Sequence, residues 1–141
     1  MYKKRQLANG LTIIGAPIKD SKTTTLFVMV SVGSRYEQES ERGLSHFLEH
    51  MMFKGTKKRP NAKVIATELD SLGASYNAFT GYEYTGYYVK VRNEKKEVAL
   101  DIIADIFQNS TFNQKDILTE RGAIVEEINM YKDLPMQSIF Y

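Results

Sequence analysis

Apolar and polar residues follow two kinds of pattern along this chain, and the first kind is typical of β-strands. β-Branched, aromatic and other apolar residues dominate three segments, which predicts strands within 6–14, 23–32 and 74–92. Asn9-Gly10 is a dipeptide favoured in two-residue hairpin turns, because both positions tolerate a positive φ. We expect 23–32 to form a buried strand closed by Gly33, and a turn or bulge at each of Gly81 and Gly86.

The second pattern repeats apolar residues every three or four positions, which predicts helices. One covers 43–53, one runs from a cap at Asn61 to Gly73, one opens at Asn93, and the last runs from Asn113 to about Lys132, with Pro135 beyond it. Together these elements predict an α+β fold, a largely antiparallel sheet with helices packed on one face. The sequence contains no repeat or linker, so 1–141 is expected to be one domain.

Composition narrows the possible functions. The 141 residues are 43% hydrophobic and 26% charged, as in a folded globular domain, and a net charge of +2 is too small to indicate nucleic-acid binding. The absence of cysteine excludes disulfides, thiolate zinc sites and a cysteine nucleophile. No apolar run reaches membrane-spanning length and no signal segment precedes the first strand, so we expect no membrane partner and a cytoplasmic location.

Both histidines of the chain lie in one predicted helical turn. His46, Glu49 and His50 share a face roughly 100° wide, because each helical residue advances by about 100°. Two imidazoles four residues apart can bind one zinc ion, and Glu49 could pass a proton from a metal-bound water to a leaving amine. A chance surface pair is the alternative, but the apolar flanks of this turn favour a metal site.

A zinc ion held by two histidines needs a third protein ligand, usually a carboxylate, with the fourth position left for water. The last predicted helix offers Glu120, Glu126 and Glu127. Glu120 and Glu127 fall within about 20° of each other on that helix, whereas Glu126 projects about 100° away. Spacing therefore favours the face of Glu120 and Glu127 without choosing between these two.

The order His-x-x-Glu-His is the inverzincin signature. In its setting the sequence resembles the pitrilysin/insulinase family of zinc metallopeptidases, in particular the processing-peptidase branch. The resemblance covers essentially the whole chain and is carried by four stretches: ERGLSHFLEHMMFKGTKKRP, LDSLGASYNAFTGYEYTGYY, ALDIIADIFQNSTF and ERGAIVEEINMYKDLP.

The resemblance assigns roles to the acidic residues. It implies one zinc ion per site, bound by His46, His50 and Glu127, with Glu49 as the general base on zinc-bound water. Glu120 corresponds to a second acidic residue that supports catalysis without being a primary ligand. The alternatives are a solvated helix face for Glu127 and an ion pair with a neighbouring Lys or Arg for Glu120.

The resemblance also implies a substrate site. In the family, the strand similar to 75–80 lies at a sheet edge beside the metal and pairs with an extended peptide, a mode that depends little on substrate side chains. Asn77 and Ala78 would contact the substrate there, with Asn77 holding a backbone carbonyl. Phe53 and Phe79 would line a pocket beside the scissile bond, and plain core packing is the alternative for both.

The expected function is that of a zinc-dependent endopeptidase hydrolysing unfolded peptides or presequences. A non-catalytic structural subunit and a peptide- or zinc-binding module of the same fold are the alternatives. Complete family members have two related halves that close around the substrate, so 1–141 would be an incomplete N-terminal zinc-binding peptidase domain. The apolar end at 136–141 also indicates a fragment. A second half of the same chain, or a homo-oligomer partner, would close the chamber and supply an arginine and a tyrosine.

Overall fold

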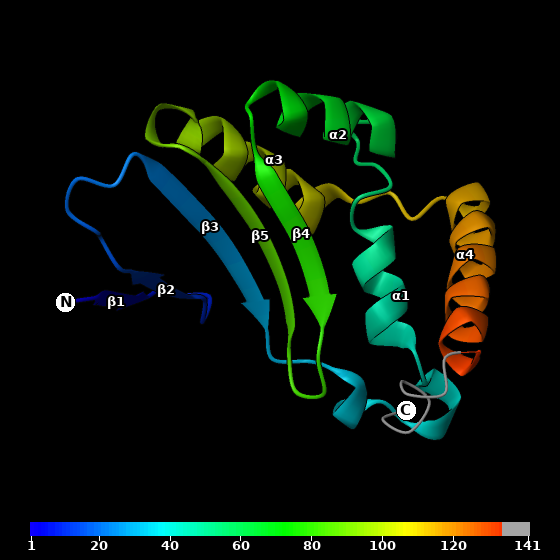
Figure 1. The fold of residues 1–141 in the computed structure, drawn as a ribbon. Coiled ribbons are helices and arrows are strands. Elements are labelled where there is room, and N and C mark those ends of the chain that lie inside the picture. Colours follow the sequence, from blue (N-terminus) through cyan, green and yellow to red (C-terminus); the bar gives the residue numbers. More distant parts are fainter. Residues whose placement is uncertain (134–141) are drawn as a thin grey trace.

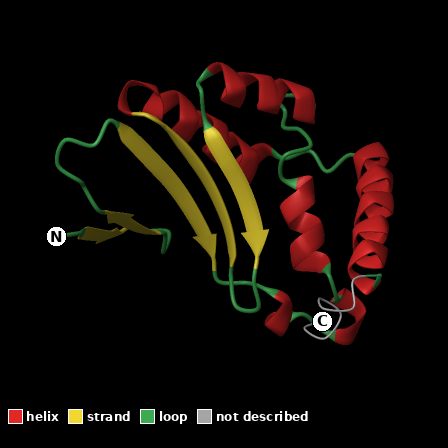
Figure 2. Cartoon of the chain, viewed as in Figure 1, coloured by secondary structure: helices red, strands yellow, loops and turns green. Residues whose placement is uncertain are grey.

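The computed structural model describes residues 1–133, which form an α+β fold (Figures 1 and 2). Pro135 and the apolar end at 136–141, both named in the sequence analysis, lie outside the described residues. The strands are β1 (Lys3–Gln6), β2 (Thr12–Gly15), β3 (Thr23–Val30), β4 (Ser75–Thr80) and β5 (Thr85–Arg92). The helices are α1 (Leu44–Met51), α2 (Ala62–Ser71), α3 (Lys96–Asn109) and α4 (Gln114–Lys132). No helix of residues 1–133 combines the length and apolar character needed to cross a membrane.

The main sheet has the order β3-β5-β4 and is antiparallel throughout, as predicted. Helices α2 and α3 lie together on one of its faces, whereas α1 and α4 lie beyond the edge formed by β4 (Figure 1). The core fills the space between the sheet and the two covering helices. It consists mainly of Ile65 and Leu69 from α2, Tyr87, Val89 and Val91 from β5, and Ala99, Ile102, Ile103 and Ile106 from α3.

The prediction of a buried strand over 23–32 is wrong, because β3 is an edge strand. Leu26 and Val28 pack against the core, but Phe27 and Met29 point to the face without helices and are 47% and 59% exposed. An uninterrupted apolar run is typical of a strand covered on both faces. Here only one face is covered within the described part of the chain.

The hairpin of β1 and β2 is confirmed, but its turn is not the expected two-residue one. The N–H of Gly10 donates to the carbonyl of Leu7 at 3.0 Å, and the N–H of Leu7 donates to the carbonyl of Leu11 at 2.9 Å. Only Gly10 takes a positive φ, of 89°, whereas a two-residue turn of this kind needs a positive φ at both positions. The result is a three-residue loop that ends in a left-handed glycine.

Gly86 does not mark a bulge, because it pairs in register with Met29 on one side and Phe79 on the other. A Cβ atom at Gly86 would lie 2.4 Å from Cζ of Phe79 and 3.0 Å from Cζ of Phe27. The glycine therefore makes room for two phenyl rings that lie over the centre of the sheet, on the face opposite the helices.

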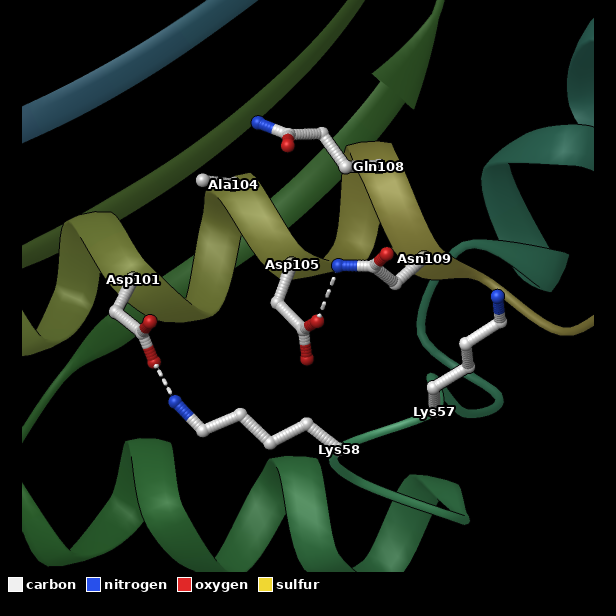
Figure 3. A pocket seen from close by; sticks show the side chains of 7 residues that line it. All are labelled: Lys57, Lys58, Asp101, Ala104, Asp105, Gln108 and Asn109. Atoms are coloured by element: carbon white, nitrogen blue, oxygen red, sulfur yellow. Dashed lines mark hydrogen bonds and ion pairs between the residues drawn. The ribbon is translucent and has the colours of Figure 1, made fainter.

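A buried polar network ties the loop after α1 to helix α3. Arg59, only 2% exposed, donates to Asp105, Asp101 and Glu68 at 2.7 Å each. Figure 3 shows the outer side of this region, where Lys58 pairs with Asp101 and Asn109 donates to Asp105 around a hollow of about 340 Å³. This network anchors the chain between α1 and α2, and the hollow contains none of the predicted site residues.

Candidate metal centre

Helix α1 begins at a residue that cannot cap it with a side chain. Gly43 takes a left-handed φ of 86° and is the N-cap of α1. The carboxylate of Glu37, from the preceding segment, accepts from the N–H groups of Gly43 at 2.8 Å and Ser45 at 2.7 Å. Burial works to raise the pKa of Glu37, but these N–H donors outweigh it and the pKa is lowered. An anionic Glu37 thus holds the first turn of the helix that carries both histidines.

The two histidines of α1 converge with a carboxylate of α4. The Nε2 atoms of His46 and His50 are 3.2 Å apart, and Oε2 of Glu127 lies 3.8 Å from the first and 3.6 Å from the second. These three residues form the potential metal-binding cluster of the described chain. Of the two carboxylates that spacing left open, Glu127 is therefore the one beside both Nε2 atoms.

This triangle of atoms fits a tetrahedral zinc ion. Nitrogen and oxygen ligands about 2.1 Å from zinc stand roughly 3.4 Å apart at tetrahedral angles, close to the three observed separations. Two imidazoles and one carboxylate are also a ligand set typical of catalytic zinc sites, which keep a fourth position open. The side chains of His46, His50 and Glu127 are 33%, 27% and 29% exposed, so solvent or a substrate can reach this position.

Glu120 is not one of the three converging groups, but it contacts the other nitrogen of the His50 ring. Its Oε2 atom is 3.2 Å from Nδ1 of His50, on the opposite side of the ring from the Nε2 atom that faces Glu127. Its Oε1 atom forms an ion pair with Lys54 at 2.6 Å. The expected alternative for Glu120, an ion pair, is thus present together with a contact to a candidate metal ligand. A carboxylate in this position fixes the tautomer and the orientation of a metal-binding histidine.

Glu49 is oriented by the last residue of β4. The hydroxyl of Thr80 donates to Oε2 of Glu49 at 2.6 Å, which ties the carboxylate to the strand predicted to bind substrate. Beneath it, burial and then the negative charge of Glu49 raise the pKa of Tyr87 to about 12, so this phenol stays protonated. Glu49 therefore links the histidine turn to the end of β4, with one oxygen held by Thr80.

β4 pairs only with β5 in the described part of the chain, so its outer edge is free beside α1. A hollow of about 320 Å³ opens between this strand, α1 with the loop after it, and the first turns of α2. Beside it, the N–H of Ala78 donates to Oδ1 of Asn77 at 2.9 Å. Of the expected substrate residues, the hollow brings together Phe53, Asn77 and Ala78, and it is also lined by Glu49, His50, Lys54 and Tyr76.

The two expected pocket phenylalanines lie in different surroundings. Phe53 packs against the core and contacts the rings of Tyr76 and Tyr87, each with centroids 6.2 Å away, while also lining the hollow. Phe79 points to the other face of the sheet, where its ring contacts Phe27 and Tyr84 at centroid distances of 6.0 Å. The structure therefore does not bring Phe79 into the hollow with the other residues.

Three residues of this centre have no signal in the sequence that singles them out. Glu37 acts from an irregular segment, Lys54 is a single lysine after the histidine helix, and Thr80 ends a strand rich in similar residues. The tertiary structure shows what they contact: Glu37 the first turn of α1, Lys54 a carboxylate of α4, and Thr80 a carboxylate of α1.

A family model described as insulinase (peptidase family M16) matches residues 16–140. The chain belongs to this family. Insulinase-family relatives include an uncharacterized zinc protease of Rickettsia bellii, 46% identical over 99% of this chain and 34% of its own length. The zinc protease YmxG of Bacillus subtilis is 42% identical over 96% of this chain and 33% of its own. The mitochondrial-processing peptidase subunit beta of Bos taurus is 44% identical over 86% of this chain and 24% of its own.

The same fold is also seen in a solved structure. The crystal structure of a protease from Helicobacter pylori superposes with a TM-score of 0.95 over 100% of this chain, at 24% identity, and supports the α+β fold. The chain covers 34% of that protein as well. It therefore spans about a third of the length of its bacterial relatives.

Proposed function

We propose that this chain carries the metal centre of a zinc-dependent endopeptidase that cleaves extended peptides. The observation that supports the proposal most directly is the convergence of both Nε2 atoms and the Glu127 carboxylate at spacings suited to one zinc ion. Membership of a family whose relatives are named zinc proteases agrees with it. Because the chain spans only part of those relatives, cleavage is assigned to the whole protein.

His46, His50 and Glu127 would hold the metal, and bound zinc supplies a Lewis acid that polarises a carbonyl and acidifies water. Glu49 accepts the proton of the attacking water and then donates it to the leaving amine. Thr80 keeps one oxygen of Glu49 turned toward the end of β4, so that the other is available for this transfer. Glu120 receives the Nδ1 proton of His50 in a hydrogen bond and leaves the Nε2 lone pair for the cation.

The free edge of β4 would bind the substrate as an added antiparallel strand. Backbone hydrogen bonds along this edge recognise any extended segment, which suits unfolded peptides or presequences. Asn77 and Ala78 would contact the substrate backbone, and Phe53 would line the wall of the hollow beside Glu49. Some relatives are named as mitochondrial-processing peptidase subunits, which is consistent with a presequence substrate. Phe79 would contribute only through the far face of β4.

A second part of the same chain, or a second copy, would close the site over the peptide. Neither nucleic acid nor a membrane is proposed as a partner, and a cytoplasmic location remains the expectation from the sequence.

The test of this function is Glu49→Gln in the whole protein. We expect the variant to keep its bound zinc, because Glu49 is not a metal ligand, and to lose cleavage of a quenched fluorescent peptide by several orders of magnitude, because no base remains. Metal analysis and the peptide assay are run on both proteins. Retained cleavage would remove Glu49 from the mechanism. Zinc without cleavage in the wild type would favour a peptide-binding module, and absence of zinc would favour a structural subunit.

A further inference from the structure

Lys54 lies in the loop just after α1 and reaches across to α4. Its Nζ atom is 2.6 Å from Oε1 of Glu120, and the other oxygen of that carboxylate is 3.2 Å from Nδ1 of His50. Each oxygen of Glu120 thus has its own partner, so the carboxylate links an ammonium group on one side to a candidate metal ligand on the other.

Glu120 needs this partner because of its surroundings. It is 7% exposed, and a buried carboxylate is stable as an anion only when it is paired and hydrogen-bonded. A carboxylate held at one oxygen has a restricted orientation, and here this orientation directs the second oxygen at His50. Without Lys54, the side-chain contact left to Glu120 among residues 1–133 would be the one with Nδ1 of His50.

We propose that Lys54 is a positioning residue of the metal centre, which acts through Glu120 to hold His50 with its Nε2 lone pair toward the cation. The inference rests on the proposed zinc-binding function and extends it by one residue. Within residues 1–133, the ion-pair partner of Lys54 is Glu120 and not a predicted metal ligand, so its effect passes through this carboxylate.

A direct electrostatic effect of Lys54 would have the opposite sign. A positive charge near a cation site repels the cation, so removing that charge would tighten zinc binding. If Lys54 instead positions Glu120 and His50, removing it weakens zinc binding. The direction of the change in zinc affinity therefore separates the two effects.

The experiment measures zinc affinity in the whole protein by competition with a chromophoric chelator. We expect Lys54→Met to lower the affinity by about tenfold, the lower end of the range for residues that support a metal ligand. Lys54→Arg, which keeps the positive charge, should restore most of it. Lys57→Met is the matched control, since Lys57 is exposed with no side-chain partner among residues 1–133, and its zinc affinity should equal that of the wild type.

A double variant tests the route through Glu120. If Lys54 acts only through this carboxylate, adding Lys54→Met to Glu120→Gln should cause no further loss of affinity. A separate, additive loss would overturn the inference, as would an unchanged or tighter affinity in Lys54→Met. If Lys54→Met does not fold by circular dichroism, Lys54→Gln against Lys54→Arg makes the same comparison. A wild type that binds no zinc would instead overturn the proposed function itself.

Discussion

Gly33 lies against the turn between β4 and β5, at the start of the segment that leads to the helix carrying both histidines. Next to it, the N–H of Ser34 donates to the carbonyl of Gly81 at 3.2 Å, and the N–H of Arg35 to that of Tyr82 at 2.9 Å. A Cβ atom on Gly33 would lie 2.3 Å from the oxygen of Gly81. Since this neighbour is backbone, it cannot swing aside as a side chain would.

We therefore expect Gly33→Ala to lower the free energy of unfolding by about 1–3 kcal/mol, the usual cost of forcing an extra methyl group into a packed site.

Gly122→Ala should instead raise the free energy of unfolding by up to about 1 kcal/mol. Gly122 lies within α4 with nothing within 4 Å of its Cβ position, so alanine there only improves helix propensity. Urea denaturation of both variants checks the signs, and a neutral Gly33→Ala would contradict the close approach.

At the scale of elements, the buried carboxylate of Asp105 connects helix α3 to the loop after α1. Asp105 accepts from Arg59 at 2.7 Å, Thr56 at 2.5 Å and Asn109 at 2.8 Å. Burial works to raise the pKa of Asp105, but these three donors and the charge of Arg59 outweigh it, and the pKa lies below the ordinary 3.8. The folded protein therefore binds this proton more weakly than the unfolded chain does.

This difference in proton affinity predicts a pH dependence of stability. The contribution of Asp105 is fully present above about pH 5 and is lost as the pH falls through the lowered pKa. Asp105→Asn should be less stable than the wild type at pH 7, and the gap between the two should narrow below about pH 4. Asp70→Asn, which removes an exposed carboxylate from α2, is the control for the loss of one negative charge. Thermal unfolding across pH measures the gap, and a constant gap would contradict the linkage.

At the scale of the whole molecule, the candidate ligands come from two helices far apart in the sequence. α1 packs against α4, and a bound ion would cross-link them through His46, His50 and Glu127. A ligand that binds only the folded state stabilises it by mass action, by about 2.7 kcal/mol at a hundredfold excess over Kd.

Zinc should therefore raise the melting temperature of the chelator-treated protein in a concentration-dependent way. Glu127→Gln should remove most of this rise, because it deletes the only ligand from α4, whereas Glu126→Gln, on a different side of the same helix, should retain it. Differential scanning calorimetry across a zinc titration measures the shift. An equal rise in the Glu127→Gln variant would mean that the ion binds elsewhere.

The strand and helix order and the histidine turn were predictable, because each depends on residues close in the chain. The caps show this most directly: Asn61 and Asn113 accept from the N–H groups of Val64 and Asp116, three residues ahead. The antiparallel sheet was also predicted, although its β3–β5 pair joins segments far apart in the sequence. One wrong prediction is local, the two-residue turn at Asn9-Gly10, where only the glycine takes a positive φ. The other two concern neighbours from distant segments. Whether β3 is covered on both faces, and whether Gly86 marks a bulge, depends on which strands and rings lie beside them.

Local spacing was sufficient to place His46, Glu49 and His50 on one helical face, since a helix turns by a constant angle per residue. It left Glu120 and Glu127 equivalent, because both lie on the same face of α4. Packing of α4 against α1 distinguishes them: Glu127 lies beside the Nε2 atoms and Glu120 behind one ring, paired with Lys54. Distances between side chains on separate helices depend on how the helices pack. The spacing of residues within one helix does not determine this packing.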